Sequence, residues 1–268
     1  MQDTLSTERS DGTTVYTWTE QGGWGSAQGH FGEEMALALY LDRVELATLM
    51  CTPEKLNFLI TGFLRSEGFI GSLDDIALMR VCDEENVADV RLMRPKKQPT
   101  GKRILTSGCG GGVTFDSGDG VVAVTSDLRV APAQLLAHMK AMLLPSDNRH
   151  GERGGLHVSA LADEKQLLVV ARDVGRHNTL DKIWGECLFR EIDTRGKVLL
   201  TTGRLSSEMM IKAAKMGVPI TVSLNSPTSR AVQLARELGI TVVGYARGGR
   251  LSVYAHPERL GVTDPAAR

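Results

Sequence analysis

The sequence lacks most features that mark membrane, secreted or nucleic-acid-binding proteins. No apolar run approaches the roughly 18 residues that cross a bilayer, and the polar first 30 residues lack the basic and apolar stretches of a secretory signal. The formal net charge of −1 gives no general attraction to nucleic acid or to anionic lipid. We therefore expect a cytoplasmic protein that binds neither membrane nor nucleic acid, in which any anion site depends on local charge.

Paired cysteines and nucleotide-binding fingerprints are also absent. The four cysteines lie far apart and form no CxxC pair, which argues against a disulfide framework, a zinc site or any tightly bound metal. The run GCGGGV from Gly108 lacks the third glycine of a dinucleotide fingerprint, and no P-loop Lys-Ser/Thr occurs. These motifs therefore do not explain the glycines of this chain.

The first half of the chain divides into two predicted parts. Residues 1–33 are polar and glycine-rich, which predicts a loose N-terminal arm, although Trp18 and Trp24 are unusual there and would pack on the body or on a partner. Residues 34–104 predict a smaller α+β domain, with a hairpin around 41–43, a helix opened by Pro53, and strands near 76–81 and 87–94.

Residues 105–268 show a different pattern, in which short apolar strands alternate with helices of about ten residues. This alternation predicts an α/β domain with a sheet flanked by helices, and ligand sites in the loops that follow the strands. The predicted helices are 131–144, 177–189, 206–216 and 228–238, and the predicted strands are 166–172, 197–202, 219–223 and 241–246.

Cys109 is the clearest candidate for chemistry. It stands in the run Thr106-Ser107-Gly108-Cys109-Gly110-Gly111-Gly112, where glycines leave the thiol accessible and several backbone N–H groups free to stabilise a thiolate. The alternative is a small buried residue in a glycine turn. Cys51, Cys82 and Cys187 lie inside apolar patterns, for which packing in the core is the better interpretation.

Two loops after predicted strands carry polar groups suited to an anion. In the first, Asp173, Arg176 and His177 stand at a strand-to-helix junction, where a helix N-terminus favours phosphate. In the second, Gly203, Arg204 and Ser206 follow the next strand, and a ligand phosphate or carboxylate would explain the first two. The alternatives are helix caps made by Asp173 and Ser206.

A third loop combines arginines with glycines. The segment comprises Tyr245, Ala246, Arg247, Gly248, Gly249 and Arg250. Two guanidiniums can bind phosphate in bidentate fashion, and the tyrosine ring offers a stacking face. A surface hairpin with two solvated arginines is the alternative.

Several long strings resemble one known family. In chain order they are TPEKLNFLITGFLRSEGFI, SGCGGGVTF, ARDVGRHNTLDK, TTGRLSSEMMIKAAKMGVPITVSLNSPTS, and ELGITVVGYARGGRLSVY followed by His256-Pro257. They are similar to the FdhD family, the accessory sulfurtransferases of formate dehydrogenase maturation, over roughly residues 36–260.

This resemblance implies a sulfur carrier. A cysteine desulfurase would pass persulfide sulfur to Cys109, which would deliver it to the molybdenum bis(molybdopterin guanine dinucleotide) cofactor before its insertion into the formate dehydrogenase catalytic subunit. The implied fold is cytidine deaminase-like, a mixed sheet flanked by helices with a smaller N-terminal domain, in a homodimer. The family's cofactor-binding segment corresponds to Tyr245–Arg250.

One departure from the family keeps alternatives open. Many relatives carry CGxC in the cysteine loop, whereas this chain has Cys109-Gly110-Gly111-Gly112 and cannot relay sulfur between two loop thiols. A chaperone that binds the cofactor without moving sulfur is therefore an alternative. A zinc-dependent nucleobase deaminase would need H-x-E with P-C-x-x-C, and the chain has neither.

Overall fold

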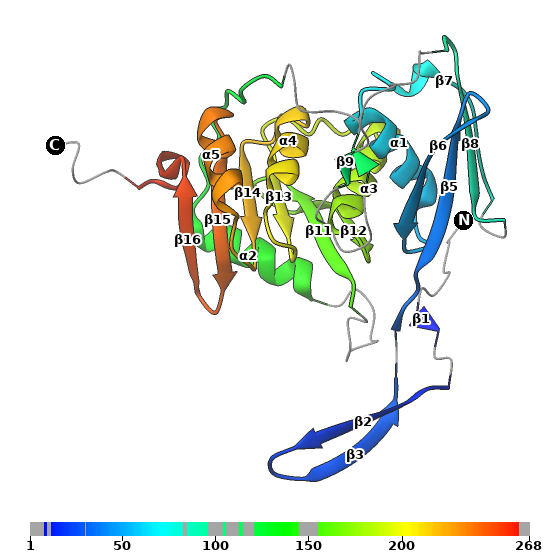
Figure 1. Ribbon diagram of the computed structural model, residues 1–268. Coiled ribbons are helices and arrows are strands. Elements are labelled where there is room, and N and C mark those ends of the chain that lie inside the picture. The colour runs from blue at the N-terminus through cyan, green and yellow to red at the C-terminus, as the bar shows by residue number, and fades with distance from the viewer. Residues whose placement is uncertain are drawn as a thin grey trace.

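The computed structural model describes residues 8–9, 12–29, 31–82, 85–95, 104–105, 113–114, 121–144 and 155–262. Two sheets lie side by side, with helices between and around them (Figure 1). The larger sheet has the strand order β12-β11-β13-β14-β15-β16, and the smaller one has the order β6-β5-β8-β7. The predicted α/β architecture, with a mixed sheet flanked by helices, is confirmed, and the likeness to cytidine deaminases stays a prediction.

The larger sheet is mixed in direction. Strands β13, β14 and β15 are parallel, whereas β11 runs antiparallel to both of its neighbours, β12 and β13. Strand β12 therefore runs in the same direction as β13, β14 and β15. The strands are β11 (His157–Ala162), β12 (Leu167–Asp173), β13 (Val198–Thr201), β14 (Ile220–Ser223), β15 (Thr241–Arg247) and β16 (Arg250–Ala255).

Helices cover both faces of this sheet and give three layers (Figure 1). Leu199 packs with the helices of one face, and its neighbours Val198 and Leu200 pack with the helix of the other, as the two-residue period of a strand requires. One face carries α3 (Arg176–Phe189), α4 (Ser207–Lys215) and α5 (Ser229–Glu237), and the other carries α2 (Pro132–Leu143).

The smaller sheet packs its buried face against one helix. Leu37, Leu39 and Leu41 alternate inward from the central strand and meet Leu59 and Ile60 of that helix. The elements are β5 (Met35–Leu41), β6 (Val44–Cys51), α1 (Leu56–Ser66), the 3-10 turn Leu73–Asp75, β7 (Ile76–Cys82) and β8 (Val87–Leu92).

The helix predicted to open at Pro53 begins later, at Leu56. Lys55 has left-handed backbone, with φ 55°, and this conformation separates Pro53 and Glu54 from the helix. The Nζ atom of Lys55 bonds the carbonyl of Val170 and lies 2.5 Å from Glu186 Oε2. The turn before α1 thus contacts β12 and α3.

Helix α1, which packs on the smaller sheet, crosses α3, which packs on the larger sheet, and the division into two domains stays a prediction. A Cβ atom on Gly62 would lie 1.8 Å from the carbonyl oxygen of Asp181, and one on Gly185 would lie 1.9 Å from that of Phe58. The helices therefore touch backbone to backbone, and only glycine fits at these two positions.

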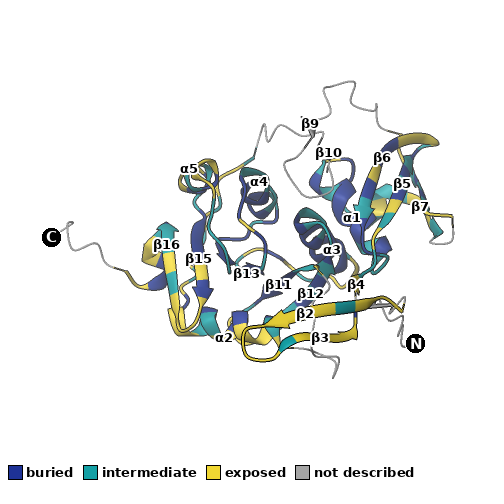
Figure 2. Cartoon of the chain, turned by 60° about the horizontal axis from the view of Figure 1, so that its bottom comes forward, coloured by how far each residue is buried: buried dark blue, intermediate teal, exposed yellow. Residues whose placement is uncertain are grey.

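The N-terminal arm contains a hairpin that the sequence does not predict. It is formed by β2 (Thr14–Thr19) and β3 (Gly23–Gln28), with β1 (Glu8–Arg9) and β4 (Phe31–Gly32) paired at its base. Trp18 stands opposite Trp24, and such cross-strand aromatic pairs stabilise a two-stranded ribbon. The hairpin projects from the molecule (Figure 1), and both of its strands are mostly exposed (Figure 2). Both tryptophans are exposed.

None of the helices in the described part of the chain is long and apolar enough to cross a membrane.

Candidate functional site

The loops predicted to bind ligand lie at one edge of the large sheet. Strands β12, β13, β14 and β15 share one direction, so the segments after them all leave from the same edge, which we call the carboxyl edge. Strands β11, β13 and β14 lie between β12 and β15. At about 4.8 Å per strand spacing, the first and last of these loops stand roughly 19 Å apart. The candidate site is therefore long.

Asp173, at one end of this edge, is completely buried. Its Oδ1 atom accepts hydrogen bonds from the backbone N of Gly175 and from Nδ2 of Asn178, at 2.8 and 2.7 Å. Its Oδ2 atom accepts the backbone N of Thr52, at 3.1 Å, and pairs with Lys182 Nζ at 2.7 Å. Both oxygens thus have partners within the protein.

His177 joins this junction to the next loop. Its Nε2 atom lies 3.3 Å from Ser206 Oγ and 3.1 Å from Glu208 Oε2. Burial, together with the positive charges of Lys212 and Arg176, lowers the pKa of His177 to about 3. The ring is therefore neutral near pH 7, and burial raises the pKa of the facing Glu208 carboxyl.

Gly203 lets the same two loops approach closely. A Cβ atom there would lie 2.9 Å from Cβ of Arg176 and 3.5 Å from Nδ1 of His157. Arg176 and Ser206 are buried at this place, whereas Arg204 is exposed. The structure thus brings Arg176, His177, Gly203 and Ser206 together, with Asp173 at the start of the same junction, and their role in binding a ligand stays a prediction.

His157 belongs to this cluster, and the sequence does not reveal it. It opens β11, a strand missing from the sequence prediction, and stands opposite Asp173 in the ladder. Burial and the charge of Arg176 lower its pKa. The sequence feature that indicates the start of this strand is a short apolar run after Gly154-Gly155.

At the other end of the edge, the predicted arginine–glycine segment forms the turn between β15 and β16. Arg247 and Arg250 stand opposite each other in the β15–β16 ladder. Gly248 and Gly249 between them adopt positive φ values of 60° and 75°, as a tight two-residue turn requires. All four residues are exposed, whereas Ala246 is buried. No carboxylate pairs with either arginine within the described residues. Their guanidiniums are available to a ligand.

Two further residues shape this end. Tyr245 is partly exposed, at 39%, and has left-handed backbone with φ 51°. Its backbone N donates to the carbonyl of Asn225. Asn225 also donates from Nδ2 to the carbonyl of Thr202, at 2.7 Å, and so links the ends of β13, β14 and β15. The sequence places Asn225 in a loop at this edge without assigning it a role.

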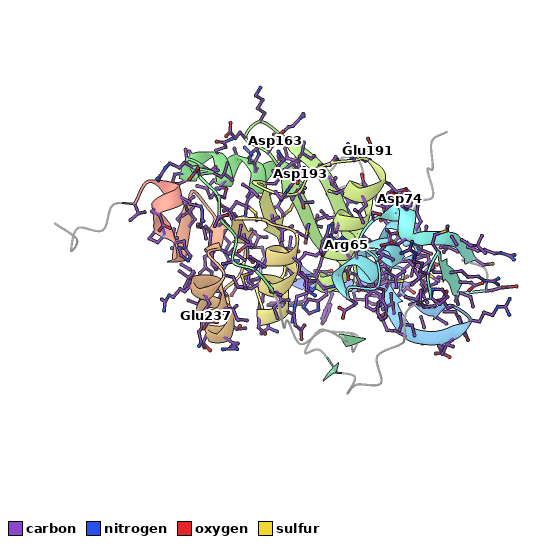
Figure 3. The ribbon with its side chains drawn as sticks, turned by 90° about the horizontal axis from the view of Figure 1, so that it is seen from above. Arg65, Asp74, Asp163, Glu191, Asp193 and Glu237 are labelled. Atoms are coloured by element: carbon purple, nitrogen blue, oxygen red, sulfur yellow. The ribbon has the colours of Figure 1, made fainter. Side chains whose placement is uncertain are left out.

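The opposite edge of the sheet has carboxylates that are satisfied locally. Asp163 accepts the backbone N atoms of Lys165 and Gln166, and Asp193 pairs with Arg195. These bonds lower the pKa of each carboxyl. Figure 3 shows Asp163, Asp193 and Glu191 on this side of the molecule.

Cys109 lies outside the described residues, between β9 (Ile104–Leu105) and β10 (Val113–Thr114). Burial raises the pKa of Cys51 and of Cys187 to about 12, so both are thiols near pH 7. Cys82 is half-buried. Within the described part of the chain, no three His, Cys, Asp or Glu side chains gather as metal ligands.

Comparison with known proteins decides the family. The family model described as FdhD/NarQ matches residues 32–261. This chain belongs to the FdhD/NarQ family. The sulfur carrier protein FdhD of Bacillus subtilis (strain 168) is 38% identical over 248 residues, covering 90% of this chain and 94% of the relative. The protein of the same name from Staphylococcus aureus (strain MRSA252) is 40% identical over 233 residues, or 85% and 88% of the two chains.

A solved structure from Desulfotalea psychrophila, assigned as a formate dehydrogenase accessory protein, has the same fold. It superposes with a TM-score of 0.75 at 26% identity and covers 92% of this chain and 98% of its own. The FdhD/NarQ match includes every loop of the carboxyl edge. The β2–β3 hairpin precedes the matched region.

Proposed function

We propose that this FdhD/NarQ chain is a sulfur carrier for formate dehydrogenase, with Cys109 as the sulfur-bearing residue. The names of its relatives and the glycine frame of Cys109 support this role. The Cys109 thiolate would attack the outer sulfur of a cysteine desulfurase persulfide. A new S–S bond forms, the donor S–S bond breaks, and the donor cysteine leaves as a thiolate. Because Cys51 and Cys187 are protonated, neither competes as a nucleophile near pH 7.

The second part of the proposal concerns the substrate, the molybdenum bis(molybdopterin guanine dinucleotide) cofactor. The observation that carries it is the unpaired arginine turn at the end of a site roughly 19 Å long, a length that suits an extended dinucleotide. Arg247 and Arg250 would bind phosphate, Gly248 and Gly249 would let the backbone approach it, and Tyr245 would stack on the base. Arg176, His177, Gly203, Arg204 and Ser206 would line the rest.

The partners follow from this role. The cysteine desulfurase supplies sulfur, and the formate dehydrogenase catalytic subunit receives the sulfurated cofactor. We also propose that the chain forms a homodimer. Molybdenum is cargo here, and the proposal needs no resident metal.

The persulfide prediction is tested by mass spectrometry. Incubation with a desulfurase and cysteine should add one sulfur that a reductant removes, on the peptide that contains Cys109. Cys109→Ala should abolish the added mass and leave folding intact, whereas the control Cys82→Ala should retain it. Sulfur on Cys51, Cys82 or Cys187 would contradict the assignment. If Cys109→Ala restored formate dehydrogenase in a strain without the native factor, the cofactor chaperone alternative would replace sulfur transfer.

The cofactor prediction is tested by calorimetry with GDP, a fragment of the cofactor. A charged hydrogen bond to phosphate contributes on the order of 1.5–3 kcal/mol. Arg250→Ala should therefore weaken GDP binding by roughly 10- to 150-fold, and added salt should weaken binding to the wild type. Arg195→Ala, at the opposite edge, is the matched control and should bind as the wild type does. Equal binding by Arg250→Ala would show that the phosphate site is elsewhere.

A further inference from the structure

A buried network joins the end of β6 to the start of α3. Its centre is Lys182, in the middle of α3, whose side chain has no exposed surface. The Nζ atom donates to the carbonyls of Thr52 and Arg172, each at 3.1 Å, and to Asp173 Oδ2 at 2.7 Å. An ammonium has three N–H donors, and all three are used. This lysine is therefore satisfied without any ligand.

The same network reaches the candidate site through the backbone. Thr52 donates its N–H to Asp173, and its Oγ1 atom accepts the N–H of Val174, at 3.2 Å. Asn178 donates from Nδ2 both to Asp173 and to the carbonyl of Met50, at 2.7 Å in each case. Asp173 also accepts the N–H of Gly175. Asp173 and Val174 are thus hydrogen-bonded to Thr52, and Gly175 is hydrogen-bonded to Asp173. Asn178 is hydrogen-bonded to both Asp173 and Met50.

These contacts enclose the two residues that would face the cofactor. Arg176 and His177 lie between Gly175 and Asn178, at the first turn of α3. Fixing the backbone on both sides fixes the direction in which their side chains leave the helix. His177 in turn contacts Ser206 at the start of the next helix. The network therefore sets the geometry of two of the carboxyl-edge loops.

We infer that Asp173 and Lys182 are positioning residues, through which the small domain holds the β12–α3 loop in its binding conformation. Asp173 does not touch the ligand. This inference rests on the proposed cofactor site and deepens it. An ion pair this deeply buried gains little net stability, because desolvation offsets the attraction. The Asp173–Lys182 ion pair instead selects one conformation of the β12–α3 loop, because its hydrogen bonds are directional and apolar packing is not.

Asp173→Asn is the sharpest test, and Lys55→Met is its matched control. Lys55 also joins the segment before α1 to Glu186 and to the carbonyl of Val170, but it makes no hydrogen bond or ion pair with residues 173–178 in the described structure. Both variants should melt at a lower temperature than the wild type. At a temperature where circular dichroism shows both fully folded, Asp173→Asn should bind GDP about tenfold more weakly or worse, because charge-assisted contacts depend on geometry. Lys55→Met should bind as the wild type does.

Hydrogen exchange of the peptide that spans residues 173–180 tests the positioning role separately from the cofactor site. Without GDP, Asp173→Asn should exchange the amides of Val174 and Gly175 faster, whereas Lys55→Met should leave them protected. If wild-type protein fails to bind GDP but this contrast appears, the cofactor site is wrong and the positioning role stands. Unchanged exchange in Asp173→Asn, or equal loss of GDP affinity in both variants, would overturn the positioning role.

Discussion

The two ends of the carboxyl edge are built from similar sequence and have opposite physical character. Both place glycine beside arginine directly after a strand. At the β12–α3 end, Asp173 and Arg176 are buried, and the carboxylate has four partners within the chain. At the β15–β16 end, Arg247 and Arg250 are exposed and lack a carboxylate partner among the described residues. One end is a buried junction with the segment that follows β6, and the other is exposed.

This contrast shows that a polar motif after a strand does not by itself identify a ligand contact. What separates the two ends is whether another part of the chain covers them. The α1–α3 contact brings β6 against the first loop, whereas the two-residue turn between β15 and β16 is exposed among the described residues. Substitutions at the two ends should therefore divide into those that unfold the protein and those that only affect binding.

The largest effect is expected at the helix crossing that covers the first loop. In Gly185→Ala, the new Cβ would lie 1.9 Å from the backbone oxygen of Phe58, so α1 and α3 must separate. We expect a loss on the order of 3–5 kcal/mol in the free energy of unfolding. Gly248→Ala is the control at the exposed end, where no described residue lies within 4 Å of the added atom. Its positive φ should limit the loss to about 1 kcal/mol. Comparable losses in urea unfolding would remove the distinction between the ends.

The same crossing explains which parts of the fold the sequence reveals. Helices α2 to α5 and strands β12 to β15 are predicted within a few residues, because their apolar periodicity is local. Strands β11 and β16 are missed, since the first is a short apolar run and the second is hidden by the interpretation of Arg247–Arg250 as a ligand loop. The glycines of the crossing carry no sequence signal, because their reason is a contact with another helix.

The candidate site shows the same limit. Polar residues after successive strands predict a common edge, because parallel strands end together, and this expectation is confirmed by the topology. The burial of Asp173 is not predictable, since its partner Thr52 lies 121 positions earlier in the chain. His157 and Asn225 are missed as site residues for a related reason: only the assembled sheet brings them beside Gly203 and Tyr245.

A smaller effect should appear as a dependence of stability on pH at the buried end. The pKa of His177 is about 3 in the folded state and ordinarily 6.5, so below pH 6.5 the unfolded chain binds a proton that the folded chain does not. Stability should fall by about 2 kcal/mol between pH 7 and pH 5 through this group. His157 acts in the same direction, because its pKa is also lowered. The pKa of Glu208 is raised in the folded state, so just above its ordinary value of 4.5 the folded chain binds a proton that the unfolded chain does not. This group therefore raises stability as the pH falls, opposite to His177.

His177→Gln isolates the contribution of this ring. Glutamine can still hydrogen-bond to Ser206, so the variant should remain folded and should lose less stability than the wild type between pH 7 and pH 5. Urea unfolding at the two pH values measures this difference. Arg250→Ala, at the exposed end, should follow the wild-type curve. An unchanged slope in His177→Gln would mean that the ring is not held neutral in the folded protein.

The smallest effect, and one of opposite sign, is expected from Tyr245→Gly at the exposed end. Tyr245 has a φ of 51°, and left-handed backbone costs a residue with a side chain about 1–2 kcal/mol. Glycine removes that strain but loses about 0.5–1 kcal/mol more conformational entropy on folding. The ring is 39% exposed, so little packing is lost, and the variant should be as stable as the wild type or more stable by up to about 1 kcal/mol.

The GDP affinity of Tyr245→Gly should fall, because the stacking face is gone. A variant that is more stable and binds GDP less well would indicate that the strain is retained for binding. A clear loss of stability with unchanged GDP affinity would instead make Tyr245 a packing residue and would weaken the contrast between the two ends.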